Sequence, residues 1–265
     1  MKTLIEPMGV FEFGRKLIES KDVDPVYVLL WNCPEVQTVL KRWLIAYWCF
    51  YHMGTSSWIA DGGSENRFWG KMEQAAASKE FPRCPERRHF RGQNAVKSVS
   101  YLRYHGIDKL FEPFEDGMAA REVMKEVQKW VGFGPWISFK VADMLERLDL
   151  ARIVFKSEDV YLFDSPKEGA ERMRAELGVG VDDEDLQTWA VETLTEEFRD
   201  LTAPPNHQRL VGPQEAETVL CKWKSYLNGS YRLGEDIESC RNCLLRFAKT
   251  KLSQDLLRAG RNLLW

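Results

Sequence analysis

The sequence predicts an all-α fold. Apolar residues recur at the 3.6-residue spacing of a helix through most of the 265-residue chain. Extended character is confined to residues 150–165, in the short runs Ile153–Phe155 and Val160–Phe163. A hydrophobic content of 44%, with ten tryptophans, is enough to build the core of one domain or of two small ones.

Prolines and glycines mark the helix ends in the first half of the chain. Pro34 suits the first position of a helix, where its missing N–H costs no hydrogen bond. Apolar residues follow Pro34 at helical spacing, and two glycines in Trp58–Ser64 end this pattern. The pattern predicts a helix from Pro34 past Tyr51, one from about Ser64 through Met72, one through Val96 and Leu102 that ends near Gly106, and helices at about 117–130 and 135–149.

Helices resume in the second half. Asp182 suits the N-cap of a helix, because its side chain can accept a hydrogen bond from the first turn. Pro213 again suits a first helical position. We expect helices at about 166–176 and 183–200, one from Pro213 through Leu227, and two shorter ones at the end.

The whole chain, residues 1–265, is expected to form one helical unit. If it divides, the two lobes are about 30–150, and about 1–29 with 151–265. No apolar stretch approaches ~20 residues, and the N-terminus lacks the apolar segment of a signal peptide. We therefore expect a cytoplasmic protein with no membrane partner, whose six cysteines are reduced thiols.

Charge is unevenly spread around a formal net charge of −3. Residues 157–201 hold fourteen acids against four Lys/Arg, whereas residues 241–261 hold six Lys/Arg against one acid. Residues 83–91 hold four arginines and one glutamate. A net charge near zero, combined with local basic patches, suits an enzyme that binds DNA on one face. The alternative is that these charges are scattered and solvated.

One sequence motif predicts phosphate binding. Val131-Gly132-Phe133-Gly134 joins two amphipathic helices, and Pro135 opens the second. Glycines permit a tight turn and leave their N–H groups unshielded, and these point outward with the helix N-terminus. The arrangement fits a DNA phosphate; an ordinary turn between helices is the alternative.

Gly132-Phe133-Gly134-Pro135-Trp136 and the helix after it resemble the hairpin of helix-hairpin-helix DNA glycosylases of the alkyl-purine type. The resemblance implies a glycosylase-like helical fold and an essential aspartate about twenty residues beyond the hairpin, in a short extended segment. Asp159 in the segment Val154–Leu162 matches it, if the second helix has an extra turn, and Asp164 is a weaker match. The lysine of bifunctional glycosylases is absent after the hairpin.

Three stretches carry a second resemblance: Glu86–Gly92 (ERRHFRG), the hairpin with Lys140 and Asp143, and Cys221–Ser225 (CKWKS) with Tyr231 and Gly234–Asp236. They resemble the alpha-glutamyl/putrescinyl thymine pyrophosphorylases of bacteriophages, also called amino acid:DNA transferases. These are similar to a helical domain found beside the P-loop of hydroxymethyluracil DNA kinases. This chain has no G-x-x-x-x-G-K-[ST], so it is not itself a P-loop kinase of this kind.

The second resemblance implies that an amine or amino acid replaces pyrophosphate on 5-(pyrophosphoryloxymethyl)uracil in double-stranded DNA, in the host cytoplasm. A departing pyrophosphate needs its charge neutralised, which arginine forks do well. The candidate pyrophosphate ligands are Arg87, Arg88, His89, Arg91, Lys222 and Lys224; the candidate DNA-phosphate ligands are Gly132, Gly134, Trp136 and Lys140.

The attacking amine must be neutral, so a general base is required. Asp159 is the first candidate and Asp61 the second, with helix capping as the alternative for Asp61. Asp143 is more consistent with an ion pair to Lys140 or Arg147. Cys221, flanked by Lys222, could instead add to uracil C6 and help expel the leaving group, or it could be a buried helix cysteine.

We expect neither a metal nor a cofactor. Zinc takes four ligands in two pairs, whereas Cys240-x-x-Cys243 is the one close pair, on an expected helix. A base must leave the duplex stack to react, and Trp58, Trp69 or Trp136 could stack on it unless they belong to the core. The rival functions are a monofunctional DNA glycosylase and a non-catalytic DNA-binding module.

Overall fold

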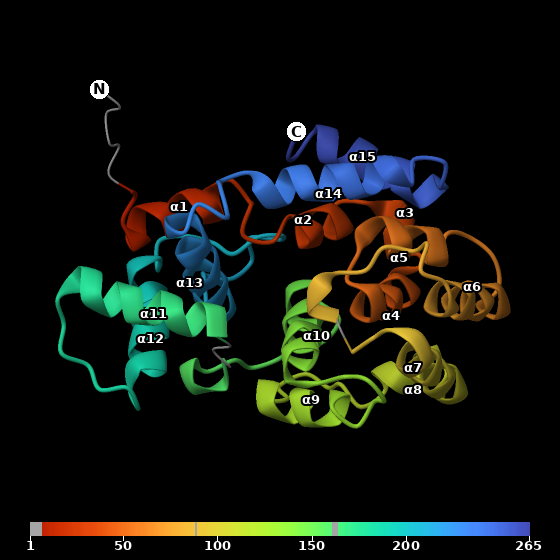
Figure 1. Cartoon of the computed structure of the whole chain (residues 1–265), viewed down its shortest axis with the longest axis horizontal. Coiled ribbons are helices and arrows are strands. Elements are labelled where there is room, and N and C mark those ends of the chain that lie inside the picture. The colour runs from red at the N-terminus through yellow and green to blue at the C-terminus, as the bar shows by residue number, and fades with distance from the viewer. Residues whose placement is uncertain (1–6, 88, 161–163) are drawn as a thin grey trace. The chain divides into compact units, whose positions relative to one another are not determined.

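The computed structural model describes residues 7–87, 89–160 and 164–265, and these residues confirm the all-α class (Figure 1). Within them no strand forms, and the extended pairing consists of two isolated bridges, Ala119 with Val154 and Thr202 with Leu210. None of their helices is long and apolar enough to cross a membrane.

The chain divides into two compact units. Unit 1 comprises Met1–Pro25 and Phe155–Ile237, and unit 2 comprises Val26–Val154 and Glu238–Trp265. The two-lobe division expected from sequence placed residues 238–265 with the first unit; here they belong to the second.

Two contacts explain why the C-terminal segment belongs to unit 2. The ring of Phe247 lies 5.8 Å from the ring of His52, measured between centroids. The Lys251 amide donates a hydrogen bond of 3.2 Å to the Asp61 carboxylate. Both contacts attach the last part of the chain to the two residues that flank α5, a helix of the first half that spans Met53–Ala60.

Unit 1 is a bundle around one central helix, α13. This helix packs against α1, α11 and α12 (Figure 1). Trp223 of α13 is buried, and its indole N–H donates to the carbonyl of Met8 at 3.0 Å. The elements of unit 1 are α1 (Val10–Glu19), η2 (Ser157–Asp159), α11 (Asp164–Leu177), α12 (Leu186–Glu197) and α13 (Pro213–Leu227), and α14 (Glu235–Arg246) begins there.

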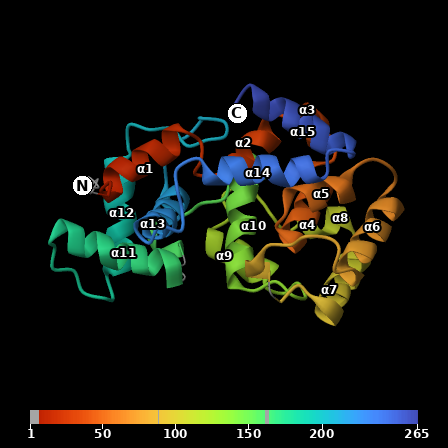
Figure 2. The same cartoon turned by 45° about the horizontal axis from the view of Figure 1, so that its top comes forward.

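Unit 2 is built from helix pairs. α4 packs on α5, α6 on α7 and α9 on α10, while α15 covers α3 and α5 (Figure 2). Trp43, Trp48 and Phe50 of α4 are buried in the core. The elements are α2 (Pro25–Trp31), α3 (Pro34–Gln37), α4 (Leu40–Phe50), α5 (Met53–Ala60), α6 (Glu65–Ala77), η1 (Pro85–Arg87), α7 (Gly92–His105), α8 (Ile107–Phe111), α9 (Ala120–Val127), α10 (Pro135–Arg147) and α15 (Lys251–Arg261).

Several helix boundaries differ from the sequence-based expectation. The helix expected from Pro34 is three helices, because the backbone leaves the helical region at Val39 and again at Tyr51, whose φ of +48° is left-handed. α12 begins at Leu186 rather than 183, and the carbonyl of Asp182 instead accepts from the Asp185 amide in the preceding turn. α1 and α2 were not expected.

The two short runs expected to be extended, Ile153–Phe155 and Val160–Phe163, form no strand among the described residues. Val154 forms one bridge, and residues 157–159 form the 3₁₀ helix η2. Residues 161–163 of the expected run Val160–Phe163 lie outside the described residues.

Candidate nucleic-acid interface

The Gly-x-Gly turn lies between α9 and α10, as the sequence predicts. Gly132 has a φ of +83°, which only glycine adopts readily. Gly134 differs: its φ of −96° suits any residue, it is exposed, and a Cβ added to it would have no neighbouring heavy atom within 4 Å. Gly132 therefore makes the turn, and Gly134 leaves space beside the helix start.

The first turn of α10 has neither a capping side chain nor an acidic residue. Gly134 is the N-cap, and Pro135 is at the first helical position. The first N–H groups of a helix have no partner within the helix and lie at the positive end of its dipole. This end of α10 can therefore receive a phosphate.

Two predicted DNA-phosphate ligands follow on α10, and both are half-buried. The ring centroid of Trp136 lies 4.9 Å from that of Tyr51, edge to face. The Lys140 ammonium lies 5.1 Å from the centroid of Phe139. Tyr51 is the last of a row of aromatic rings along α4, and its ring centroid lies 4.5 Å from that of Tyr47. Tyr51 was not among the predicted site residues, although its i, i+4 spacing to Tyr47 is visible in the sequence.

Asp143, also on α10, is structural. Its carboxylate pairs with Arg147 at 3.8 Å and accepts from the Tyr27 hydroxyl at 2.7 Å, and both ion-pair side chains are buried. The predicted ion pair with Arg147 is confirmed.

The arginine loop, residues 82–91, packs directly against the hairpin, although 45 residues separate Arg87 from Gly132. Arg87 Nη1 donates to the carbonyl of Gly132 at 3.3 Å. Ser98 of α7 also lies under the turn, because a Cβ on Gly132 would come within 3.4 Å of it. The structure thus brings two predicted motifs to one place in unit 2.

The remaining residues of the arginine loop differ in exposure. His89 and Arg91 are exposed. Arg91 is the N-cap of α7, without a side-chain capping bond, and the first turn of α7 has no acidic residue. Arg87, by contrast, is buried. Arg88, the fourth predicted pyrophosphate ligand of this loop, lies outside the described residues.

The two candidate general bases belong to different units. Asp61, in unit 2, accepts from the Lys251 amide and so caps the start of α15, the alternative role considered for it. Asp159, in unit 1, is 7% exposed, and its Oδ2 accepts from the Lys156 amide at 3.1 Å. This contact was not foreseen, since the sequence pattern predicts an extended segment there.

The predicted ligands of the CKWKS stretch lie on α13 in unit 1. Lys222 pairs with Asp236 at 2.6 Å, and Lys224 pairs with Glu168 at 3.1 Å. The half-buried Cys221 has its sulfur 3.5 Å from the hydroxyl oxygen of Ser165. Both lysines are therefore already ion-paired within the chain.

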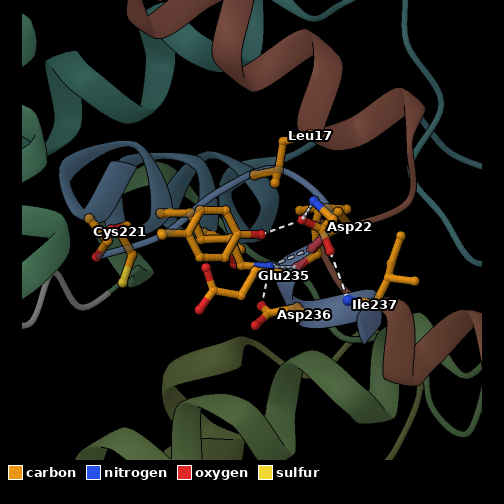
Figure 3. A network of polar contacts seen from close by, with 12 residues as sticks. Leu17, Asp22, Cys221, Glu235, Asp236 and Ile237 are labelled. Atoms are coloured by element: carbon orange, nitrogen blue, oxygen red, sulfur yellow. Dashed lines mark hydrogen bonds and ion pairs between the residues drawn. The ribbon is translucent and has the colours of Figure 1, made fainter. Parts of the chain in front are cut away.

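A buried carboxylate, which no sequence pattern indicated, binds the segment that follows the CKWKS stretch. Asp22 is fully buried, and it accepts hydrogen bonds from the amides of Gly234 at 2.7 Å and Ile237 at 2.9 Å, and from the Tyr231 hydroxyl (Figure 3). Lys222 donates to the carbonyl of Val23 at 2.9 Å. Desolvation and the neighbouring carboxylates raise the pKa of Tyr231.

Two of the three candidate stacking tryptophans already pack within the protein. Trp69 is buried, and its indole N–H donates to Glu65 at 3.0 Å. Trp58 is half-buried against Phe81, with centroids 4.5 Å apart. Trp69 therefore belongs to the core, whereas Trp136 lies in the first turn of α10, at the candidate phosphate site.

Cys240 and Cys243 both lie on α14 as free thiols. Burial raises the pKa of Cys243. In the part of the chain that the structure describes, His, Cys, Asp and Glu side chains form no group of three suited to a metal ion.

Comparisons with known proteins agree on one family. Residues 18–231 match the family model described as amino acid:DNA transferase. The chain is 35% identical, over 92% of both chains, to a glycinyltransferase of Pseudomonas phage PaMx11. It is 25% identical to a putrescinyltransferase of Delftia phage PhiW-14, over 96% of this chain and 83% of that protein.

Proposed function

The chain belongs to the amino acid:DNA transferase family, and on this premise we propose that it replaces pyrophosphate on a DNA pyrimidine with a small amine or amino acid. The proposed substrate is 5-(pyrophosphoryloxymethyl)uracil in double-stranded DNA. The relatives named glycinyltransferase and putrescinyltransferase support a donor with a primary amine. Their phage origin supports action in the cytoplasm of an infected host.

The observation that carries the proposal is the contact between Arg87 and Gly132, which sets the arginine loop beside the hairpin. DNA modification of this kind needs a group that holds the backbone and a group that receives the leaving pyrophosphate. The first turn of α10 supplies the former role. The exposed Arg91, at the uncapped start of α7, supplies the latter, with His89 and Arg88 as further candidates.

The proposed reaction is a substitution at the exocyclic methylene carbon of the base. The amine nitrogen forms a bond to this carbon, the carbon–oxygen bond breaks, and pyrophosphate leaves with the electron pair. The general base removes the proton that the nitrogen loses. We propose Asp159 for this role, from the match of its segment to the aspartate beyond the hairpin in the glycosylases, with Asp61 as the second candidate. A cysteine route, in which Cys221 first adds to C6 of uracil, is the alternative chemistry.

Reaction at the methylene carbon requires the nucleobase to leave the stack. Trp136 is the best-supported stacking partner, since it is half-buried in the first turn of α10 and contacts Tyr51. An aromatic partner offsets a few kcal/mol of the unstacking energy.

Mass spectrometry of nucleosides tests the function. The protein is incubated with duplex DNA that contains 5-(pyrophosphoryloxymethyl)uracil and with glycine, putrescine or another amine; thymine DNA is the control. We expect a thymidine derivative with the mass of one donor and release of pyrophosphate. Free base and abasic sites would identify the rival glycosylase, and unchanged nucleosides with retained DNA binding would identify a binding module.

A further inference from the structure

Arg87 is a buried cation at the base of the hairpin. It is 4% exposed, and its Nε donates to the carbonyl of Cys49 at 3.1 Å while Nη1 donates to that of Gly132 at 3.3 Å. The guanidinium carbon lies 5.3 Å from the ring centroid of Phe90 and 5.0 Å from that of Phe133. One side chain thus joins the end of α4 to the turn.

The charge of Arg87 is not neutralised by an acid. No carboxylate pairs with it among residues 7–87, 89–160 and 164–265. Burial lowers the pKa of the guanidinium to about 10, so the group still carries its charge at neutral pH. Its Nη2 is buried with no hydrogen-bond partner in the described structure. A buried donor without an acceptor destabilises a fold, so other contacts of the guanidinium must offset this cost.

The environment explains how the charge is tolerated. Cys49 lies in the last turn of α4, where the helix dipole is negative and favours a cation. Two aromatic faces add cation–π attraction. The guanidinium is thus held by two backbone carbonyls and two aromatic rings, and little of it is exposed to a ligand.

We propose that Arg87 is a positioning residue for the DNA-phosphate site rather than a pyrophosphate ligand. It holds the Gly132 carbonyl against the end of α4 and so fixes the turn that leads into the start of α10, while the Phe133 amide within the turn donates to the Trp130 carbonyl at 3.1 Å. Its buried charge also raises the potential at the start of α10, because a low-dielectric surrounding screens it weakly. This inference rests on the proposed role of the hairpin in binding DNA.

Arg83 supplies a matched control in the same loop. Its Nη1 donates to Phe90 at 2.7 Å and its Nη2 to Ala75 and Ser78 at 3.1 and 2.9 Å. Its guanidinium also packs on the Phe90 ring. Arg83 therefore stabilises the loop by the same kinds of contact, but none of these contacts reaches the hairpin.

The test compares Arg87→Gln with Arg83→Gln by fluorescence anisotropy on duplexes of several sequences, at a series of salt concentrations. We expect Arg87→Gln to weaken binding about tenfold for every sequence, with a flatter salt slope, and Arg83→Gln to stay within about twofold of wild type. In turnover assays KM for DNA should rise while kcat is retained. Equal loss in both variants, or unchanged affinity in a folded Arg87→Gln, overturns the proposal.

Two further variants keep the outcome decisive. If Arg87→Gln does not fold, Arg87→Lys replaces it: lysine keeps the charge but has one nitrogen in place of the separate Nε and Nη1 donors of the planar guanidinium, and it loses the stacking on the two rings. Affinity should then fall several-fold, with Arg83→Lys near wild type, and equal affinities overturn the proposal. Gly134→Asp separates the premise from the inference. If Gly134→Asp binds DNA normally, the hairpin is not the interface; if it binds weakly and Arg87→Gln binds normally, only the role of Arg87 fails.

Discussion

The carboxylate of Asp22 accepts a hydrogen bond from the hydroxyl of Tyr231, although 209 residues separate them along the chain. The same carboxylate accepts from the amides of Gly234 and Ile237 at the start of α14. An ionised acceptor at this end of a helix is favoured by the dipole. One buried side chain thus caps α14 and fixes the segment after α13 to the segment after α1.

Asp22→Asn should therefore destabilise the protein. Asparagine keeps one acceptor oxygen but turns an amide donor toward the N–H groups it must bond. Urea denaturation should show a loss of about 2–3 kcal/mol in the free energy of unfolding. Tyr231→Phe removes one donor only and should cost about 1 kcal/mol. Equal losses in the two variants would mean that the amide contacts of Asp22 add little.

The hairpin prediction uses two substitutions of Gly134. Because its φ is −96° and space surrounds it, neither alanine nor aspartate strains the turn. Gly134→Ala should bind DNA nearly as wild type. Gly134→Asp places a carboxylate where a phosphate is expected, so affinity should fall with little dependence on sequence and the salt slope should flatten by about one contact. Similar titration curves for the two variants would remove the hairpin from the interface.

Arg91→Ala tests the leaving-group site. If Arg91 neutralises departing pyrophosphate, turnover of saturating DNA should fall about ten- to a hundredfold, the equivalent of one charge-assisted contact, with little change in DNA affinity. Arg103→Ala is the control, since Arg103 lies on α7, the helix whose N-cap position Arg91 occupies, but pairs with Glu73 at 2.6 Å. Pyrophosphate release measures turnover. A loss of affinity with normal turnover would show that Arg91 contacts only the backbone.

His52 predicts a pH dependence of stability. Its Nδ1 accepts from the Thr55 amide at 3.1 Å, capping α5, and burial followed by the charge of Arg246 lowers its pKa to about 4. The folded protein thus favours neutral His52, whereas the unfolded chain protonates it near pH 6.5. This contribution is present above pH 6.5 and is lost as the pH falls toward 4.

His52→Asn isolates that effect, because asparagine can cap the helix but does not titrate. Urea denaturation between about pH 7 and about pH 4.5 should show that wild type loses more stability than the variant, on the order of 2 kcal/mol over this range. Parallel curves for the two proteins would exclude titration of His52 as the cause.

Periodicity predicts most of the helices, but it does not resolve local breaks. The stripe after Pro34 continues through Tyr51 in the sequence, while the backbone turns left-handed there to start α5. The spacing of Val10, Phe13 and Leu17 is helical, yet no helix was expected at α1. Asp182, the expected N-cap, instead lies in a turn that precedes α12, because the helix begins at Leu186.

The hairpin could be predicted because its signal is local: two glycines, a proline and amphipathic flanks. Asp22 could not, because its partners lie more than 200 residues away and one acid among many carries no pattern. Arg87 and Arg91 have the same chemistry and lie close together in the sequence. They differ in burial, which depends on the tertiary fold: Arg87 is buried, whereas Arg91 is exposed.

Asp159→Asn tests the proposed general base. Asparagine has the same shape, and its Oδ1 can still accept from the Lys156 amide, so η2 should persist. It cannot take a proton, and loss of a general base costs about 10²–10⁴-fold in rate. The variant should therefore bind DNA normally and nearly stop turning over. Asp185→Asn, at the exposed position before α12 where the side chain makes no capping bond, is the control and should remain active.

The pH profile of the Asp159→Asn variant distinguishes the two enzyme mechanisms. In a transferase, raising the pH should partly rescue it, because more of the amine is then already neutral and needs no base. In a glycosylase, the same substitution would stop base release, and neither added amine nor higher pH would restore it. Nucleoside mass spectrometry from about pH 7 to about pH 10, with a fixed total amine concentration, makes the measurement. Full activity of Asp159→Asn at neutral pH would exclude Asp159 from either mechanism and direct the search to Asp164 and Asp61.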